Sequence, residues 1–549
     1  MERRDFIRLS VVGAAAGIAA PAIATAETAK AVTADVFYTK DAPGRWSGKV
    51  ATHLPNIKIA KEGSKVNIEI ITAHEMKGYE HYIVKHVLLD KDYQFLNERM
   101  FNPMEDKAAV SNFTLEGYSG TLYALSMCNK HDLWLNAVEV EFVVPFSRHT
   151  RRAKVFIIMK AQNIFHYPLF ALGFRPFFTL AGLSALLLLT VWSAIVKGTW
   201  SGDNYFPNNN WHGHEMLLGY TSAVIAGFFL TAVKNWTGKA SLTGDALAGL
   251  CLLWLYGRIV PFYANLLPDT LIAAIDFAFL PILAYQSSKP IIASKQYHLL
   301  FFTAMLLLMA LGNGLIHTEI LGLSQATSQL GMALVLAIII LLILVIGGKV
   351  FPFFIERGLS STIIIKNPLL DQLAIATAAI AFTCQLFFDM PALIAGTFVV
   401  AAIANIARLS AWYVGRIWYV PLLWILYVGY GWIIVGFVLT ALAAYQVVLP
   451  SLAMHAFTIG GIGVLTLGMM ARVSLGHTGR VLKASNTIAI AFLLLNLAVM
   501  FRVLMPIAMI GWYNAFLYIS ILCWLAAFAL FVFVYLPMLS GNRVDGKAD

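Results

Sequence analysis

The stretch Cys128-Asn129-Lys130-His131 places a thiol and an imidazole three residues apart, in a region whose apolar residues alternate as in β-strands. Imidazole binds iron, copper, zinc and nickel, and a thiolate ligand donates charge that tunes a redox metal. Taken singly, Cys128 is equally consistent with a small core residue, and each upstream histidine with an exposed turn. Together they favour one metal site, in which Cys128 and His131 are the expected catalytic residues. The predicted metal ligands are His53, His74, His81, Cys128 and His131.

Alternation with a period of two extends over residues 35–145 and predicts an all-β domain. In Lys65-Val66-Asn67-Ile68-Glu69-Ile70, the three apolar residues share one face of a strand. The same pattern puts His81 and His86 on opposite faces of one strand, so we do not expect His86 to bind the metal. Turn signals separate the predicted strands at Gly63-Ser64, Lys77-Gly78 and Tyr118-Ser119-Gly120.

Four motifs around these residues resemble the superoxide reductase family, which includes the desulfoferrodoxins and neelaredoxins. They are His53-Leu54-Pro55, His74-Glu75-Met76, Glu80-His81-Tyr82-Ile83 and Cys128-Asn129-Lys130-His131. The resemblance spans roughly residues 35–142 and implies an immunoglobulin-like β-sandwich. It also implies one mononuclear non-haem iron, bound by four equatorial histidines and one axial cysteine, and a superoxide reductase-type oxidoreductase activity.

Three departures from the family pattern bear on activity. Ala51-Thr52 replaces the Glu-Lys pair that precedes the first histidine, so the lysine that draws in superoxide is missing there. His74 and His81 are seven residues apart where six are expected, and Asp132 stands in place of a glycine. Metal binding tolerates these changes more easily than superoxide reduction does. Three lysines are candidates to supply the missing positive charge: Lys49, Lys77 and Lys130.

The composition indicates an integral membrane protein with one soluble domain. Of 549 residues, 59% are hydrophobic and 12% are charged, whereas soluble domains are about 25% charged. Residues 27–165 hold a large share of the Asp, Glu and Lys. The net charge of +10 is therefore interpreted as loop charge that orients helices and meets lipid, and no nucleic-acid partner is expected. The four cysteines form no CxxC pair, so no zinc knuckle or disulfide framework is predicted.

The N-terminus has the pattern of an export signal. Arg3-Arg4-Asp5-Phe6-Ile7 precedes an apolar run rich in Ala and Gly, followed by small residues suited to cleavage. We interpret residues 1–26 as a twin-arginine signal, with an ordinary signal anchor as the alternative. Such export carries folded proteins, which suits a domain that acquires its metal in the cytoplasm. Residues 27–147 then form the iron-binding domain and 148–166 a basic linker.

The second half of the chain is expected to be an all-α domain that crosses a bacterial inner membrane many times. About twelve apolar stretches approach the roughly 20 residues that a spanning helix needs. We predict a membrane domain over residues 167–537 and a polar tail over 538–549. The predicted spans are 169–196, 214–233, 242–261, 267–285, 298–316, 326–347, 370–388, 391–408, 420–443, 450–471, 486–505 and 509–536.

Two signals disagree about which side of the membrane holds the β domain. With the helices counted as above, loops on its side carry most of the Lys and Arg, which places it in the cytoplasm under the positive-inside rule. The twin-arginine signal places it in the periplasm. Because a targeting signal is recognised before loop charge acts, we favour the periplasm.

Histidines near the ends of the predicted helices form a second candidate site. Ionisable residues in spanning helices are costly, so each is a functional hypothesis, although a single interfacial histidine often serves as a hydrogen-bonded anchor. By the helix count, His214 and His455 begin helices that run in the same direction, and we expect them to share one metal or haem site. Glu215 or Thr458 would orient them. The candidate cofactor-binding residues are His214, His317, His455 and His477.

Motifs over residues 170–485 resemble the NnrS family of membrane proteins, which implies haem and copper cofactors and a role in the nitric oxide response. Tyr427 stands where we would expect a histidine. The motifs are Leu172-Gly173-Phe174-Arg175-Pro176-Phe177-Phe178, His212-Gly213-His214-Glu215-Met216, Asn235-Trp236-Thr237-Gly238, Met454-His455-Ala456-Phe457-Thr458 and Ser474-Leu475-Gly476-His477-Thr478-Gly479-Arg480.

Three functions remain open on the sequence. The first is a membrane-bound iron enzyme that reduces superoxide or a related small oxidant such as nitric oxide, supplied with electrons by an unidentified donor. The second is a module that binds or senses a metal or nitric oxide. The third is a transporter or assembly factor for copper or haem. The five ligand residues favour the first two, whereas the absent Glu-Lys pair weakens the first.

Overall fold

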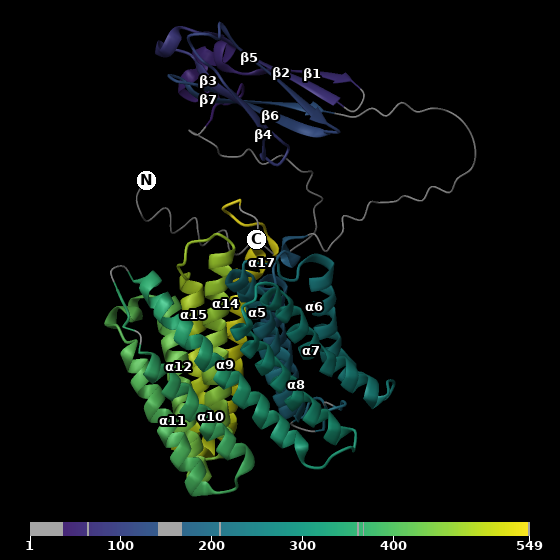
Figure 1. The fold of residues 1–549 in the computed structure, drawn as a ribbon, viewed down its shortest axis with the longest axis vertical. Coiled ribbons are helices and arrows are strands. Elements are labelled where there is room, and N and C mark those ends of the chain that lie inside the picture. The colour runs from purple at the N-terminus through teal and green to yellow at the C-terminus, as the bar shows by residue number, and fades with distance from the viewer. Residues whose placement is uncertain are drawn as a thin grey trace, which may run out of the picture. The chain divides into compact units, whose positions relative to one another are not determined.

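The computed structural model describes residues 37–62, 65–140, 167–201, 203–207, 210–359, 362–365 and 367–546. It divides into two compact units, Met1–Val155 and Phe156–Asp549, each described here by itself (Figure 1). The predicted signal at 1–26 and linker at 148–166 lie outside the described residues.

The first unit is an antiparallel β-sandwich, as predicted. Its three-stranded sheet has the order β1-β2-β5, and its four-stranded sheet has the order β4-β3-β6-β7. A short helix, α2 (Val50–His53), precedes the strands. The strands are β1 (Asn56–Glu62), β2 (Lys65–Glu75), β3 (Ile83–Leu89), β4 (Phe95–Met100), β5 (Ala108–Glu116), β6 (Gly120–Cys128) and β7 (Asp132–Val140).

The core of the sandwich follows from the alternation. Along β2, residues 66, 68, 70, 72 and 74 are buried. His74, near the end of the strand, therefore lies on the same buried face as the apolar residues before it. Along β6, every second residue from Leu122 is buried, and this face ends at Cys128. Residues from both sheets meet in one apolar core, and the alternation therefore delivers His74 and Cys128 to one end of it.

The second unit contains twelve described helices that are long and apolar enough to cross a membrane, which confirms the predicted number and class. The last helix, α17 (Tyr513–Ser540), continues past residue 537. The twelve spans are Phe174–Val196 (α3), Asn210–Thr237 (α4 Asn210–His214, η5 Glu215–Thr221 and α5 Ser222–Thr237), Gly244–Tyr263 (α6 Gly244–Ile259 and η6 Val260–Tyr263), Asp269–Ala293 (α7), Tyr297–Ile320 (η7 Tyr297–Leu299 and α8 Leu300–Ile320), Thr327–Gly358 (α9), Pro368–Phe387 (α10), Pro391–Ala411 (α11), Pro421–Ala444 (α12), Pro450–His477 (α13 Pro450–His455, η9 Ala456–Gly463 and α14 Val464–His477), Asn486–Ala508 (α15 Asn486–Val499, η10 Met500–Leu504 and α16 Met505–Ala508) and Ile510–Ser540 (η11 Ile510–Trp512 and α17 Tyr513–Ser540).

Three spans contain a turn of π-helix. The segments are η5 (Glu215–Thr221), η9 (Ala456–Gly463) and η10 (Met500–Leu504). The first begins directly after His214 and the second directly after His455. Because π-helical turns are rare and concentrate at functional sites, their position directly after His214 and His455 keeps both histidines as candidate site residues.

Candidate metal centre

The five predicted ligands meet at one end of the β-sandwich. Four segments supply them: α2 ends at His53, β2 contributes His74, the turn before β3 contributes His81, and the β6–β7 hairpin contributes Cys128 and His131. One potential ligand atom from each residue lies within 4.8 Å of all the others. His53, His74 and Cys128 are buried, whereas His81 and His131 are half-buried.

The ring nitrogens of the four histidines form a chain of short contacts. His53 Nε2 lies 2.9 Å from His131 Nδ1, which lies 2.9 Å from His81 Nε2. His81 Nε2 in turn lies 3.0 Å from His74 Nε2. The sulfur of Cys128 lies to one side, 3.6 Å from His131 Nδ1 and 3.8 Å from His74 Nε2.

Hydrogen bonding alone does not account for these short contacts between the histidine nitrogens. A ring nitrogen holds either one proton or one in-plane lone pair, yet His131 Nδ1 and His81 Nε2 each face two other nitrogens. Ligands about 2.1 Å from a shared metal, at right angles to one another, lie about 3.0 Å apart, which is the spacing found here. The four imidazoles and the thiol would therefore fit a single metal ion that they share.

The ring nitrogen of His53 that faces away from this centre, and the sulfur of Cys128, are each held by neighbours. His53 Nδ1 contacts the Thr52 hydroxyl at 2.8 Å and the Lys49 carbonyl at 3.2 Å. The backbone N–H of Lys130 lies 3.5 Å from the Cys128 sulfur, which also packs in an apolar cluster with Ile83 and Phe101. Such outer partners fix tautomers and tune the metal.

The imidazoles are neutral at pH 7. Burial, and then the neighbouring histidines, lower the pKa of His53 and of His74 to about 4. Burial also lowers the pKa values of His81 and His131. Because a metal binds the unprotonated nitrogen, the fold prepares these side chains as ligands.

The structure places the three candidate lysines near the site. The positive charges of Lys49 and Lys130 act on both His81 and His131, and that of Lys77 acts on His81. The half-buried side of the cluster therefore has a positive field, although the usual lysine before the first histidine is absent.

The backbone explains the glycine that the family has at position 132. Asp132 has φ of +60°, in the left-handed region that glycine adopts freely and aspartate tolerates. It closes the three-residue β6–β7 turn, where Cys128 pairs with Asp132. Its carboxylate accepts hydrogen bonds from Arg45 at 2.6 Å and from the Trp46 indole at 2.9 Å.

A turn of 3-10 helix, η2 (Gly78–Glu80), lies between His74 and His81. His81 follows this turn and precedes β3, so it does not share a strand with His86 as the alternation predicted. His86 is nevertheless outside the cluster: Nδ1 contacts Ser111 Oγ at 2.8 Å and Nε2 contacts Thr72 Oγ1 at 2.9 Å. It is a buried link between the two sheets.

The structure groups two of the predicted histidines of the membrane half with a carboxylate. His214 is grouped with His317 and Asp276, and His455 is not part of this group. Instead, His455 Nδ1 donates to the Ser451 carbonyl at 2.6 Å. His477 ends α14, with its ring 5.5 Å from that of Phe174. The predicted site shared by His214 and His455 stays a prediction, since this group contains only one of the two.

Sequence reasoning missed three members of the His214 group. Asp276 lies in the middle of α7 (Asp269–Ala293) and is 3% exposed. Arg258 belongs to α6 (Gly244–Ile259) and pairs with Asp276. Asn313 in α8 (Leu300–Ile320) donates to the same carboxylate. A charged residue in the middle of an apolar span was the available signal for Asp276.

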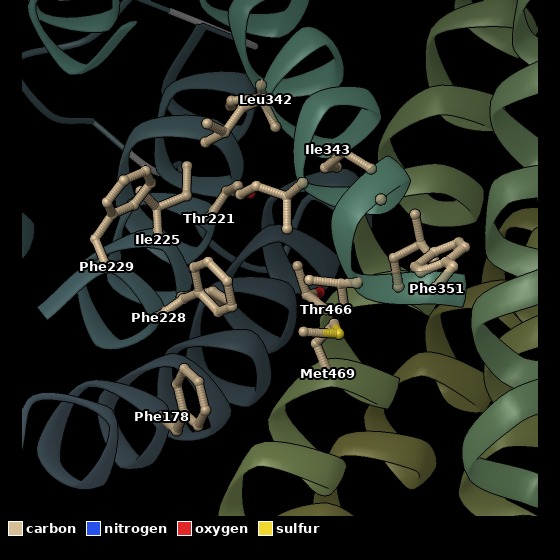
Figure 2. A pocket seen from close by; sticks show the side chains of 16 residues that line it. Phe178, Thr221, Ile225, Phe228, Phe229, Leu342, Ile343, Phe351, Thr466 and Met469 are labelled. Atoms are coloured by element: carbon tan, nitrogen blue, oxygen red, sulfur yellow. The ribbon is translucent and has the colours of Figure 1, made fainter. Parts of the chain in front are cut away.

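An apolar cavity of about 90 Å³ lies between η5, α5, α9 and α14 (Figure 2). Thr221 and Thr466 contribute the only side-chain hydroxyls of its lining, and Thr466 is bonded to Tyr220 at 2.6 Å. Thr221 ends the π-helical segment that begins at Glu215. A cavity lined in this way suits a small apolar molecule better than water.

These features define a class of protein: a multi-pass membrane protein that carries a β-sandwich with a cluster of four histidines and one cysteine. The chain belongs to the NnrS protein family, whose sequence model matches residues 168–543. The desulfoferrodoxin family matches residues 45–137. The protein is therefore a superoxide reductase-like domain fused to an NnrS domain.

The first unit has relatives among superoxide reductases. The superoxide reductase of Pyrococcus abyssi is 34% identical over 110 residues, which are 18% of this chain and 93% of that protein. The superoxide reductase of Thermococcus kodakarensis is 32% identical over 112 residues, again 18% and 93% of the two chains. The solved structure of superoxide reductase (neelaredoxin) from Ignicoccus hospitalis is 28% identical, with a TM-score of 0.17, over 19% of this chain and 94% of that one.

Proposed function

We propose that the β-sandwich binds one non-haem iron and reduces superoxide. Four imidazoles and one thiolate bind it: His53, His74, His81, Cys128 and His131. The observation that carries the proposal is the convergence of their donor atoms at metal-ligand spacing. Bound iron supplies the electron, and reduction of superoxide by one electron and two protons yields hydrogen peroxide.

The surrounding residues have separable roles in this proposal. Lys49, Lys77 and Lys130 attract the superoxide anion to the half-buried side of the cluster. The apolar cluster of Ile83 and Phe101 keeps water from the Cys128 sulfur. Neutral imidazoles leave the anionic thiolate as the one charged ligand, and its charge favours electron transfer from the metal.

For the membrane half, we propose a haem or copper site in a bacterial inner membrane. For the whole protein, we propose a role in defence against superoxide or nitric oxide. Its support is the membership of residues 168–543 in the NnrS family. The β-sandwich lies in the periplasm in this proposal, exported by the twin-arginine signal at residues 1–26. Electrons come from a donor that has yet to be identified.

A second candidate is a module that binds iron or nitric oxide without turnover, or that handles copper or haem for a partner. Ala51-Thr52, in place of the Glu-Lys pair, favours it. The two candidates share the metal site and differ in the rate of superoxide consumption.

The test is anaerobic purification of the full chain, followed by iron counting, a visible spectrum of the oxidised form and superoxide consumption. We expect one iron per β-sandwich and a thiolate-to-iron band that Cys128→Ser removes while iron is retained, since imidazoles provide most of the affinity. His86→Gln is the matched control and should keep the band. A Cys128→Ser spectrum identical to the wild type would refute the axial thiolate, and an intact site without superoxide consumption would favour the second candidate.

A further inference from the structure

The membrane half contains a buried cluster of charged and polar side chains from four helical segments. His214 and Glu215 lie at the α4–η5 junction, Arg258 in α6, Asp276 in α7 and His317 in α8. His214 and Glu215 are fully buried, and Asp276 and His317 are 3% and 4% exposed. So many ionisable groups in an apolar bundle are costly unless something binds there.

The hydrogen bonds of His214 leave one of its nitrogens in an unusual position. Nδ1 faces the Glu215 carboxylate at 3.2 Å, so it carries the proton. A neutral ring then has a lone pair on Nε2, but this atom faces Asp276 Oδ2 at 3.1 Å and Asn313 Oδ1 at 3.0 Å. Three lone pairs pointing at one another repel, so a positive ion or a second proton must lie between them.

One oxygen of Asp276 has too many nitrogen neighbours. Oδ2 lies 3.1 Å from His214 Nε2, 3.0 Å from His317 Nε2 and 2.9 Å from Asn313 Nδ2, while Oδ1 pairs with Arg258. Of these three nitrogens, the unprotonated Nε2 of His214 has no proton to donate, so its short contact with the carboxylate oxygen is not a hydrogen bond. The 3.0–3.1 Å spacings are again those of ligands around a shared metal.

The charges of the cluster do not balance. Glu215 and Asp276 bring two negative charges, and Arg258, which lies 3.3 Å from Glu215 and pairs with Asp276, brings one positive charge. With both imidazoles neutral, one negative charge remains in excess. A buried uncompensated charge costs several kcal/mol, so the cluster needs one further cation.

We propose that His214, Asp276 and His317 bind one divalent first-row transition-metal ion inside the membrane half. Two imidazoles and one carboxylate suit iron, copper, zinc or cobalt better than magnesium or calcium. The outer nitrogens are already oriented, because Glu215 holds His214 Nδ1 and Tyr205 Oη lies 3.1 Å from His317 Nδ1. This carboxylate–histidine–metal arrangement is common at metal sites.

The proposal rests on the part of the proposed function that gives the membrane half a metal, and it locates that metal away from His455 and His477. It is independent of the iron site in the β-sandwich. The ring of Phe206 lies over His214, with centroids 4.1 Å apart, and covers the cluster with an apolar side chain.

The experiment uses the full chain in detergent, stripped with a chelator, reloaded with cobalt(II) and freed of excess metal. Cobalt per chain is then counted for the wild type and for Asp276→Asn and His317→Ala. We expect each variant to bind one cobalt fewer than the wild type. His298→Ala changes an exposed histidine just before α8 and should bind as much as the wild type.

Tyr205→Phe provides a milder test, because it removes one hydroxyl and leaves all three ligands. We expect it to weaken cobalt binding at this site about 10- to 100-fold, as loss of an outer partner does. Cobalt retained in the β-sandwich and a monodisperse elution profile show that a variant has folded. If folded Asp276→Asn binds as much cobalt as the wild type, the proposal is wrong and the cluster is balanced by a proton on His214. Haem content, measured on the same samples, reports separately on the proposed function.

Discussion

The two candidate metal sites of this protein differ in how the charges of their side chains are balanced. The cluster in the β-sandwich consists of four neutral imidazoles and one thiol, and two of its histidines are half-buried. The cluster in the membrane half places Glu215, Arg258 and Asp276 beside two histidines; Arg258 is half-buried and the other four residues are buried. A site that reaches solvent can leave its charge to water and lysines, whereas one inside an apolar bundle must balance its charge internally.

Removal of Arg258 tests this difference with the largest expected effect. Arg258→Met leaves Glu215 and Asp276 without their cation and should lower the free energy of unfolding of the membrane half by about 3–5 kcal/mol. Adding Asp276→Asn should restore part of the loss. Lys58→Met removes a partner of Glu69 at the exposed surface of the sandwich and should cost less than about 1 kcal/mol. Thermal or denaturant unfolding measures both, and equal losses would contradict the comparison.

The pH dependence of the β-sandwich is the second test. Burial, and then the charge of Arg99, lowers the pKa of His86 to about 4, below the value of about 6.5 in the unfolded chain. The unfolded state therefore binds more protons between these values, and stability is complete above pH 6.5 and falls as the pH decreases toward 4. We expect His86 to contribute a loss of up to about 1.4 kcal/mol per pH unit.

Denaturant unfolding of metal-free residues 27–147 over this pH range gives the measurement. His86→Gln removes the titrating group, so the difference between the wild type and this variant should become smaller as the pH falls. A difference that does not change with pH would show that His86 is not kept neutral by the fold.

The lysines near the iron site provide a smaller, kinetic test. If Lys49, Lys77 and Lys130 replace the missing lysine, changing all three to Gln should slow superoxide consumption roughly tenfold at low salt. The difference should shrink as added salt screens the charges. Lys91→Gln, which changes a lysine paired with Asp92, is the control. Stopped-flow rates that are the same in the triple variant and the wild type would remove these lysines from the mechanism.

The smallest effect is expected at Asp132. Asp132→Gly loses exposed contacts with Arg45 and Trp46 but relieves the backbone at φ of +60°, so the stability of the sandwich should change by less than about 1 kcal/mol. Asp132→Val loses the same contacts and adds a branched side chain, which should cost about 1–2 kcal/mol. Should the two variants unfold at the same denaturant concentration, the backbone explanation fails.

Much of the fold was predictable because it depends on local periodicity. Alternation predicted that Val66, Ile68 and Ile70 share one face of a strand, and these residues are buried in β2; apolar length gave twelve spans. The motifs also identified the five candidate ligands, since their types and spacings are unusual together. The prediction that His81 continues β3 was wrong, because a 3-10 turn separates it from the strand.

The sequence by itself determined the β-sandwich, the helical membrane half and the residues of the first candidate metal site. The sandwich follows from apolar residues that alternate with a period of two, the membrane half from apolar stretches long enough for spanning helices, and the candidate ligands from short motifs. Only the tertiary structure decided that His214 meets His317 and Asp276 and that Arg258 lies inside the bundle. These partners come from separate helices, and hydrophobic patterns do not specify which face of one apolar helix packs against which face of another. Which helices lie next to one another is decided by packing contacts between residues far apart in the sequence and by the need to balance buried charge.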